Sequence, residues 1–233
     1  MRGDGVNNID SAKESPFLVM LQVALWGKSG IDWSLAESEN RLRLNRSAWS
    51  DLQVILQYKL SMAPVLEYGQ LPSVSGPLTI HAHYTRDEIL VALGHWSLDR
   101  RPEHREGVLH IKHSRVDAFF VTLQKTEADY SPTTMYEDYL VSHNLFHWQS
   151  QSNTSAESNT GQRYIHHEAM GYTPLMFVRE HNDLPSGLSA PYAYLGPCQY
   201  VSHQGSRPMS IIWKLRHPVP ARLFRVMARQ IIA

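Results

Sequence analysis

The hydrophobic period of the chain changes near residue 78, and this change limits the fold more than any other feature. Before it, apolar residues recur at the spacing of amphipathic helices in residues 15–27 and 47–63. The segment between them, 33–47, mixes charges of both signs, as on the solvated face of a helix. After residue 78 the period shortens toward two, which is typical of strands. The sequence therefore predicts an α+β fold, with helices first and a sheet second.

Strand-like segments fill most of the second part of the chain and are separated by clusters of Gly, Pro, Asn and Ser. Their number and spacing predict a closed or strongly curved sheet, a β-barrel flanked by helices. A short helix precedes them, with a capping box formed by Thr85 and Glu88. A last helix begins near Pro220 and is expected to present Leu223, Val226 and Met227 to one side. The predicted strands are residues 107–113, 117–125, 145–151, 174–180, 191–196 and 209–215.

These patterns divide the chain into three parts. Residues 1–15 have no apolar core after their first charges, so they are expected to form a mobile leader rather than a signal peptide. Residues 16–78 form a helical module that ends in a stretch rich in Gly, Pro and Ser. Residues 79–233 form the β-rich domain.

Composition and motifs argue against several classes of function. The 22 basic residues balance 22 acidic ones, so the whole chain has no general attraction to nucleic acid or to anionic membranes. Cys198 is the only cysteine, which leaves no internal disulfide and fits a reducing cytoplasm. No apolar run is long enough to span a bilayer, and the chain has no GxGxxG, P-loop or GxSxG motif. We expect a cytoplasmic binding protein with no cofactor, no membrane contact and no catalytic residues of its own.

Histidine is frequent enough to raise the question of a metal site. His81 and His83 alternate on one segment, His143 and His147 stand four apart, and residues 166–168 read His-His-Glu. None of these groups has a second set of ligands at the usual spacing, and neighbouring residues of a strand face opposite ways. The sequence therefore predicts surface histidines and hydrogen-bonded core histidines, and no metal site.

The neutral total hides a local excess of positive charge. Residues 200–233 contain six basic and no acidic residues, and residues 100–115 contain five basic and two acidic ones. Such faces suit contacts to DNA phosphates, although a solvated closing helix or pairing with acids of the helical module would explain them equally well. The polar stretch 152–163 suggests a flexible finger or a long exposed hairpin loop. The candidates for DNA backbone or groove contacts are Lys112, Arg115, Gln162, Arg163, Arg207 and Lys214.

A family resemblance covers residues from about 79 to 220. The strings "REGVLHI", "DYSPTTMYEDY", "LFHWQSQS" and "GSRPMSIIWKLRHPVPARLF" resemble a C-terminal domain of large bacterial proteins that join a phospholipase-D-type nuclease to a superfamily-2 helicase. Some of these proteins cut DNA that contains modified cytosine, and this domain is regarded as their SRA-like specificity module. The resemblance implies an SRA-like, PUA-like barrel and two kinds of partner: modified double-stranded DNA, and helicase and nuclease domains in the same or another chain. This chain carries neither helicase nor nuclease motifs, so we expect an excised fragment or a stand-alone relative.

Residues 135–152 also resemble SRA domains directly. SRA domains have a Gly-Gly-Tyr-Glu-Asp-Asp turn and a second aromatic residue twelve positions after the tyrosine. Here Tyr136 stands in the turn and Trp148 follows at the same spacing, while Thr134 and Met135 replace the glycines and Tyr139 replaces the second aspartate. The resemblance implies that the two aromatics sandwich a flipped base, with Asp138, or alternatively Glu137, accepting from its exocyclic amine. It also assigns Gln149, Ser150 and Gln151 to the base edge and the methyl slot.

The chemistry of modified-base recognition explains these residue types. Reading a 5-substituted cytosine in a pocket requires flipping the base, which costs a few kcal/mol that aromatic stacking offsets in part. An acidic acceptor facing the N4 amine distinguishes cytosine from thymine. Three functions remain open: a reader of 5-methylcytosine or 5-hydroxymethylcytosine, a docking domain that contacts a helicase through its N-terminal helices, and a reader of another DNA modification. Tyr136 and Trp148 are alternatively core aromatics of the sheet.

Overall fold

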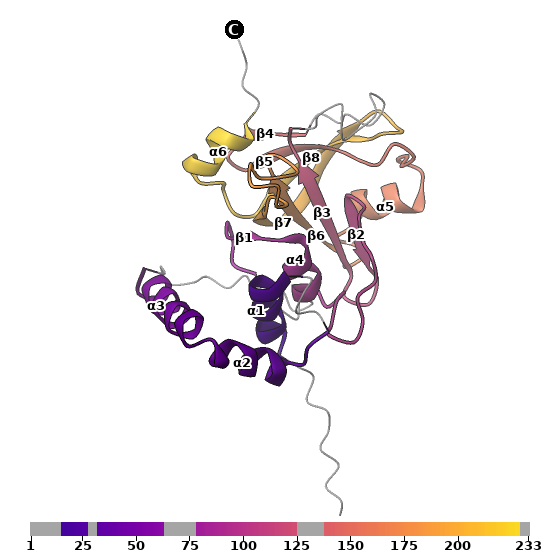
Figure 1. Cartoon of the computed structure of the whole chain (residues 1–233). Coiled ribbons are helices and arrows are strands. Elements are labelled where there is room, and N and C mark those ends of the chain that lie inside the picture. The colour runs from indigo at the N-terminus through magenta and orange to yellow at the C-terminus, as the bar shows by residue number, and fades with distance from the viewer. Residues whose placement is uncertain (1–14, 28–31, 63–77, 125–137, 229–233) are drawn as a thin grey trace, which may run out of the picture.

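The computed structural model describes residues 15–27, 32–62, 78–124 and 138–228. Nearly all of the expected leader lies outside these residues, and so do Tyr136 and Glu137. The described residues form an α+β fold with six helices and an eight-stranded sheet, so the predicted class is confirmed. In Figure 1 the first three helices lie together at one end of the molecule and the sheet lies at the other.

The first three helices are α1 (Pro16–Trp26), α2 (Leu35–Leu44) and α3 (Arg46–Met62). Helix α1 begins at a proline and ends at Gly27, as the sequence predicts. Its buried side chains Val19, Met20 and Val23 pack in one hydrophobic cluster with α4 (Arg86–Ala92) and one face of the sheet. Helix α4 begins at the predicted capping box, in which Thr85 and Glu88 each accept a backbone hydrogen bond from the other residue. No helix in the described part of the chain is long and apolar enough to cross a membrane.

The sheet has the strand order β2-β3-β6-β7-β8-β5-β4, and β1 pairs with β7 beside this path. All six predicted strands are present, and β3 pairs with β6 in parallel while the other pairs are antiparallel. Within the described residues the two ends of the path do not pair, so the sheet is not closed and a barrel is not shown. The strands are β1 (His83–Tyr84), β2 (Val108–Ile111), β3 (Val116–Thr122), β4 (Tyr139–Ser142), β5 (Leu145–Gln149), β6 (Thr173–Arg179), β7 (Tyr192–Gln204) and β8 (Ser210–Leu215).

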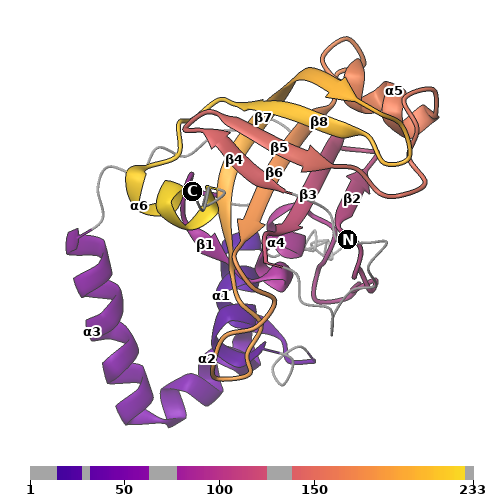
Figure 2. The same cartoon turned by 90° about the horizontal axis from the view of Figure 1, so that it is seen from above.

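Strand β7 joins the two halves of the sheet because it is long enough to pair with β6 first and β8 afterwards. Pairing with β6 ends at Pro197, and pairing with β8 begins at Cys198. Just before this point Gly196 has φ 92°, and a Cβ there would come within 2.9 Å of the Ile80 side chain. A glycine therefore permits the change of direction that lets one strand serve both halves. Figure 2 shows β7 and β8 side by side across the molecule, with α3 standing clear of the sheet.

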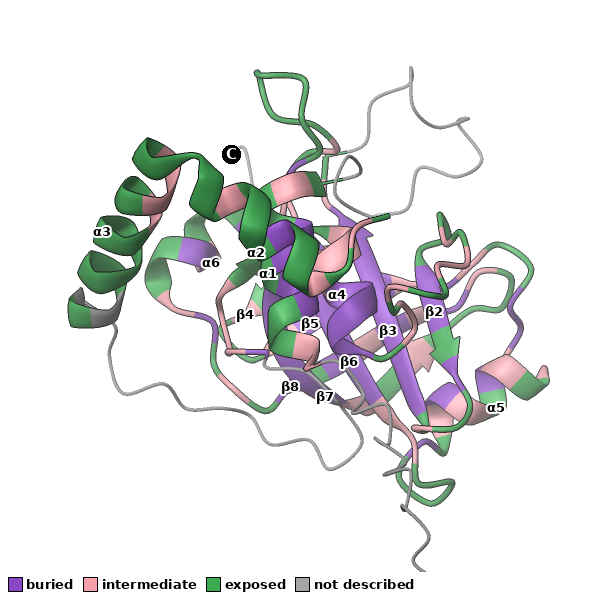
Figure 3. Cartoon of the chain, turned by 60° about the horizontal axis from the view of Figure 1, so that its bottom comes forward, coloured by how far each residue is buried: buried purple, intermediate pink, exposed green. Residues whose placement is uncertain are grey.

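The sheet curves so that β3 faces β5 although three strands separate them in the sheet order. The rings of Phe119 on β3 and Trp148 on β5 stack with their centroids 4.4 Å apart. One hydrophobic core lies inside this curve and includes Phe146, Met176 and Trp213. The other core lies outside, between β3, β6, β7 and the helices α1 and α4. Figure 3 shows this arrangement as buried strands and a buried α4, with α3 largely exposed.

Three parts of the fold differ from the sequence prediction. The expected finger or hairpin loop at 152–163 is wrong, because residues 159–165 form helix α5 (Asn159–Ile165), whose Ser158 side chain caps the Gly161 amide. The short strands β1 and β4 were not predicted. The closing helix α6 (Ala221–Met227) buries Leu223 and Met227, but Val226, expected on the same side, is 45% exposed.

Helix α5 is held to the sheet by a buried ion pair. Asp117 on β3 has a side chain only 1% exposed, and its carboxylate accepts hydrogen bonds from the Arg163 guanidinium at 2.8 and 3.2 Å. The Nδ1 atom of His110 lies 2.9 Å from the same carboxylate. Arg163 was a candidate for DNA contact, and this guanidinium is instead bound to a buried carboxylate. Breaking such a pair leaves an uncompensated buried charge.

We expect Arg163→Met to lower the free energy of unfolding by about 3–5 kcal/mol, because Asp117 would keep its buried charge without its main partner. The double variant Asp117→Asn/Arg163→Met should lose less than the two single variants combined, since the pair acts as a unit. Urea denaturation measures both. Arg43→Met is the control, because its pair with Glu39 is more than half exposed and should contribute less than about 1 kcal/mol. An equally small loss in the free energy of unfolding for Arg163→Met would contradict the stabilising role of the buried Asp117–Arg163 pair.

Candidate functional site

A pocket of about 180 Å³ lies where the two ends of the curved sheet approach each other. One side is formed by β2, β3 and the residues before β2, and the other by Asp138, which precedes β4, and by β5. The apolar parts of its lining include Val108, Phe120 and Trp148. A space of this volume is smaller than the pockets that hold drug-sized ligands and suits a single planar ring.

Four of the six residues assigned to a base pocket line this cavity: Asp138, Trp148, Gln149 and Gln151. Asp138 is 8% exposed, and its Oδ1 atom accepts a hydrogen bond of 2.9 Å from the Gln149 backbone amide. This bond joins the residue before β4 to the end of β5 and fixes the carboxylate at the pocket wall. The side chain of Gln149 donates to Ser210 Oγ at 3.4 Å, a contact to the neighbouring strand β8.

The Gln151 side chain is oriented by two hydroxyl groups. Its Oε1 atom accepts hydrogen bonds of 3.3 Å from Tyr164 and from Thr154. Burial raises the pKa of Tyr164, so the phenol stays protonated and remains a donor. Because the amide oxygen is occupied by these two donors, the amide nitrogen is the group that Gln151 can offer to a ligand.

Trp148 belongs to the pocket and to the core at once. Its side chain is 5% exposed, stacks on Phe119 and meets the edge of Tyr164 at a centroid distance of 5.6 Å. The alternative that it is a core aromatic is therefore confirmed. It also lines the cavity, and because Phe119 covers one of its faces, only the remaining surface of the indole can contact a ligand.

Ser150 does not line the pocket. Its side chain is fully buried, and its hydroxyl accepts a hydrogen bond of 2.9 Å from the Met209 amide. Its own amide donates to the Met209 carbonyl, so the residue ties β5 to the segment that precedes β8. This is a structural role, different from the one the resemblance implied. Tyr136 and the alternative acceptor Glu137 lie outside the described residues, just before Asp138 in the chain.

The opposite wall of the pocket is basic, a feature the sequence reasoning missed. Arg86 at the start of α4 donates to the Glu106 carbonyl and the Tyr192 hydroxyl, and its guanidinium lies 4.4 Å over the Phe120 ring. Arg179 at the end of β6 donates to Thr122 and Asn182. Arg105, which the sequence shows only as part of a basic segment, also lines the pocket. An arginine ending an otherwise apolar strand, as Arg179 does, was the available signal.

The candidates for DNA backbone contact lie away from this pocket. None of the six is among the residues that line it. Lys112 and Arg115 are exposed in the turn between β2 and β3, Arg207 is exposed before β8, and Lys214 is exposed on β8. Gln162 donates to the Ala156 carbonyl, as part of the local structure around α5. Contacts of these residues to DNA remain predictions.

Three of the histidines considered as metal ligands make packing or hydrogen-bond contacts within the fold. His143 donates through Nδ1 to the Val219 carbonyl and stacks on Phe224, and His147 stacks on Tyr139. His167 has both ring nitrogens occupied, by the Tyr172 carbonyl and the Tyr200 amide. Burial lowers the pKa of this residue, which favours the neutral ring that both contacts need. No group of three potential metal ligands occurs in the described ranges.

A second hollow lies among the N-terminal helices. It measures about 470 Å³ and is lined mainly by apolar residues of α1, α2 and α3, among them Leu21, Leu25 and Leu56. These three side chains are 38 to 49% exposed. On another side of α3, Val54 and Tyr58 are also exposed, although they do not line the groove. The helical module therefore presents more apolar surface than the sheet does.

Replacing Trp148 should test how far the pocket depends on the core. We expect Trp148→Ala to lower the free energy of unfolding by about 3–5 kcal/mol, because it opens a cavity beside Phe119 and Tyr164. Trp148→Phe, which keeps an aromatic ring, should lose less than half as much. Chemical denaturation followed by far-UV circular dichroism measures both variants. A loss below about 1 kcal/mol for Trp148→Ala would contradict the described packing.

The comparisons with known proteins agree with the extent of this fold. The model of a domain of unknown function, DUF3427, matches residues 78–227, which is more than half of the chain and includes every strand. None of the curated proteins compared with the chain matches it. The matched range contains both walls of the pocket, while the groove of the N-terminal helices lies before it. The chain belongs to the DUF3427 family.

Proposed function

We propose that the protein binds double-stranded DNA containing 5-methylcytosine or 5-hydroxymethylcytosine and holds the flipped modified base in the pocket between β3 and β5. One observation carries the proposal. Four residues that the SRA resemblance assigns to a base pocket, distributed over fourteen positions of the chain, line a single cavity of suitable size.

The polar groups of the pocket match the edge of a cytosine. The exocyclic N4 amine is a donor, and Asp138 presents a carboxylate fixed by the Gln149 amide. The ring nitrogen N3 and the carbonyl O2 are acceptors, and Gln151 offers its amide nitrogen. Thymine would place a carbonyl opposite the carboxylate, which is unfavourable because two acceptors would face each other. This pattern selects cytosine over thymine.

The Trp148 side chain that would contact the base is held in one position rather than free to move. Phe119 and Tyr164 hold the Trp148 indole in place, so no side-chain entropy is lost when a base contacts it. This favours binding of an extruded base, whose unstacking costs a few kcal/mol. Tyr136 is the second wall that the resemblance assigns, and its proposed role stands on the sequence alone.

The curved, open sheet with a pocket at its mouth also supports the proposed SRA-like, PUA-like architecture. In this proposal the chain is a specificity module of a type IV restriction system. Strand cleavage and translocation would be performed by nuclease and helicase domains elsewhere in the same or a partner chain, in the bacterial cytoplasm. The chain itself would supply recognition and no catalysis.

Asp138→Asn tests the assigned reader of the N4 amine. The asparagine keeps an oxygen for the Gln149 amide and removes the charge that accepts from the base. We expect it to weaken binding to a duplex with one modified cytosine by roughly 10- to 100-fold, the discrimination typical of one good base contact. Asp51→Asn, an exposed change on α3, should leave binding unchanged. Gel shifts at fixed low salt measure both variants.

The same assay decides the function itself. Wild-type protein should bind the 5-methylcytosine or 5-hydroxymethylcytosine duplex more tightly than the unmodified duplex of the same sequence. Equal affinity for all three, or no binding to any, would overturn the proposal. Preference for a phosphorothioate or a glucosylated base in the same panel would assign the protein to the other class of modification reader.

The groove among α1, α2 and α3 favours a second function, docking onto the helicase–nuclease partner. In this case the groove binds an amphipathic helix of that partner. Leu56→Asp, which places a charge in the groove, should then abolish co-purification with the helicase–nuclease. Val54→Asp is the matched control, since Val54 is exposed on the same helix outside the groove. Co-purification that survives Leu56→Asp would exclude docking through this groove.

A further inference from the structure

The pocket is electrically asymmetric, and this asymmetry carries an inference about its ligand that rests on the proposed function. The carboxylate of Asp138 lies just before β4, at the wall that β5 forms. The arginines lie at the other wall, on α4, before β2 and at the end of β6. A ligand that fits both walls carries a hydrogen-bond donor at one end and negative charge at the other.

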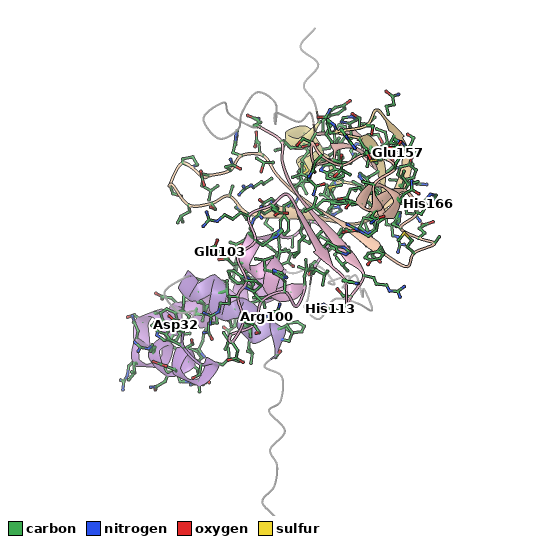
Figure 4. The ribbon with its side chains drawn as sticks, turned by 90° about the vertical axis from the view of Figure 1, so that its right-hand side faces the viewer. Asp32, Arg100, Glu103, His113, Glu157 and His166 are labelled. Carbon is green, nitrogen blue, oxygen red and sulfur yellow. The ribbon has the colours of Figure 1, made fainter. Side chains whose placement is uncertain are left out.

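The arginines differ in how firmly they are held. Arg86 is fixed by two backbone carbonyls, by Tyr192 and by the Phe120 ring, and no carboxylate of the described residues pairs with it. Arg105 is 85% exposed, and within the described residues it forms one ion pair, a 3.4 Å contact with Glu103, itself 82% exposed. Such a pair contributes little and exchanges readily for a better anion. Figure 4 labels Glu103 on the segment that joins α4 to β2.

We propose that the arginine wall is a phosphate subsite, in which Arg105 contacts the DNA backbone phosphate next to the flipped modified cytosine and Arg86 supplies a second, fixed positive charge. The geometry of a cytosine nucleotide agrees with this assignment. The amine-bearing carbon and the nitrogen that carries the sugar lie at opposite ends of the ring. With the amine at Asp138, the sugar and its phosphates extend toward the opposite wall. The ligand is therefore a nucleotide unit of the strand, rather than a base alone.

The first test measures whether removing the Arg105 charge removes one phosphate contact. Arg105→Gln should weaken binding of the modified duplex about tenfold and reduce the slope of log affinity against log salt by about 1, as loss of one phosphate contact requires. Arg46→Gln, which removes an exposed charge at the start of α3, is the matched control and should leave both quantities unchanged. Circular dichroism of each variant verifies the fold.

Methylphosphonate substitution identifies the phosphate. A single neutral linkage beside the modified cytosine should weaken wild-type binding about tenfold and have no further effect on Arg105→Gln, because both changes remove the same contact. If the losses in affinity from the methylphosphonate and from Arg105→Gln add at every phosphate position, the proposal is overturned. Arg105 would then act only through the overall electrostatic field of the protein. Equal affinities of Arg105→Gln and wild type would overturn it as well.

A second arm separates this inference from the proposed function. If the duplexes are not discriminated, the proposed function fails, and NMR titration with 5-methyldeoxycytidine and its 5′-monophosphate still tests the subsite. The monophosphate should bind wild type more tightly than the nucleoside, and Arg105→Gln should remove that difference. No difference in wild type would overturn the subsite, whatever the duplexes show.

Discussion

The stacking of Phe119 on Trp148 is the contact on which the arrangement of the site depends. It joins β3 to β5, strands that are separated by three others in the sheet order, and so holds the sheet in its curve. An aromatic pair of this kind contributes about 0.5–1.5 kcal/mol beyond the area it buries. The pocket exists because this contact brings the two ends of the sheet together while leaving them unpaired.

Further contacts keep the pocket rigid while it stays open. Gly196 lets β7 serve both halves of the sheet, and the Asp138–Gln149 hydrogen bond fixes the rim on the β5 side. On the facing side, Arg86 is fixed by carbonyl groups and by the Phe120 ring. Polar groups held in place before a ligand arrives lose little entropy on binding. Arg105, by contrast, has a side chain that is 85% exposed.

Much of the fold follows from local sequence patterns, and the errors have physical causes. The capping box of Thr85 and the six predicted strands follow from short-range signals, and they are present in the structure. Helix α5 was missed because its Ser, Asn and Gly residues also suit loops, and its stability comes from the distant partner Asp117. For the site, Trp148 and Gln149, which the resemblance assigns to a base pocket, line the cavity, while Tyr136 at the other end of the twelve-residue spacing lies outside the described residues. The basic wall could not be predicted, since its arginines come from segments that only the tertiary fold brings together.

The most direct test of this account is a crystal structure of the protein bound to a duplex with one 5-methylcytosine. The account predicts that the modified base leaves the helix and enters the pocket between β3 and β5, with its N4 atom about 3 Å from the Asp138 carboxylate. A complex in which the modified base stays stacked in the duplex, or lies against another surface while the pocket stays empty, would contradict it.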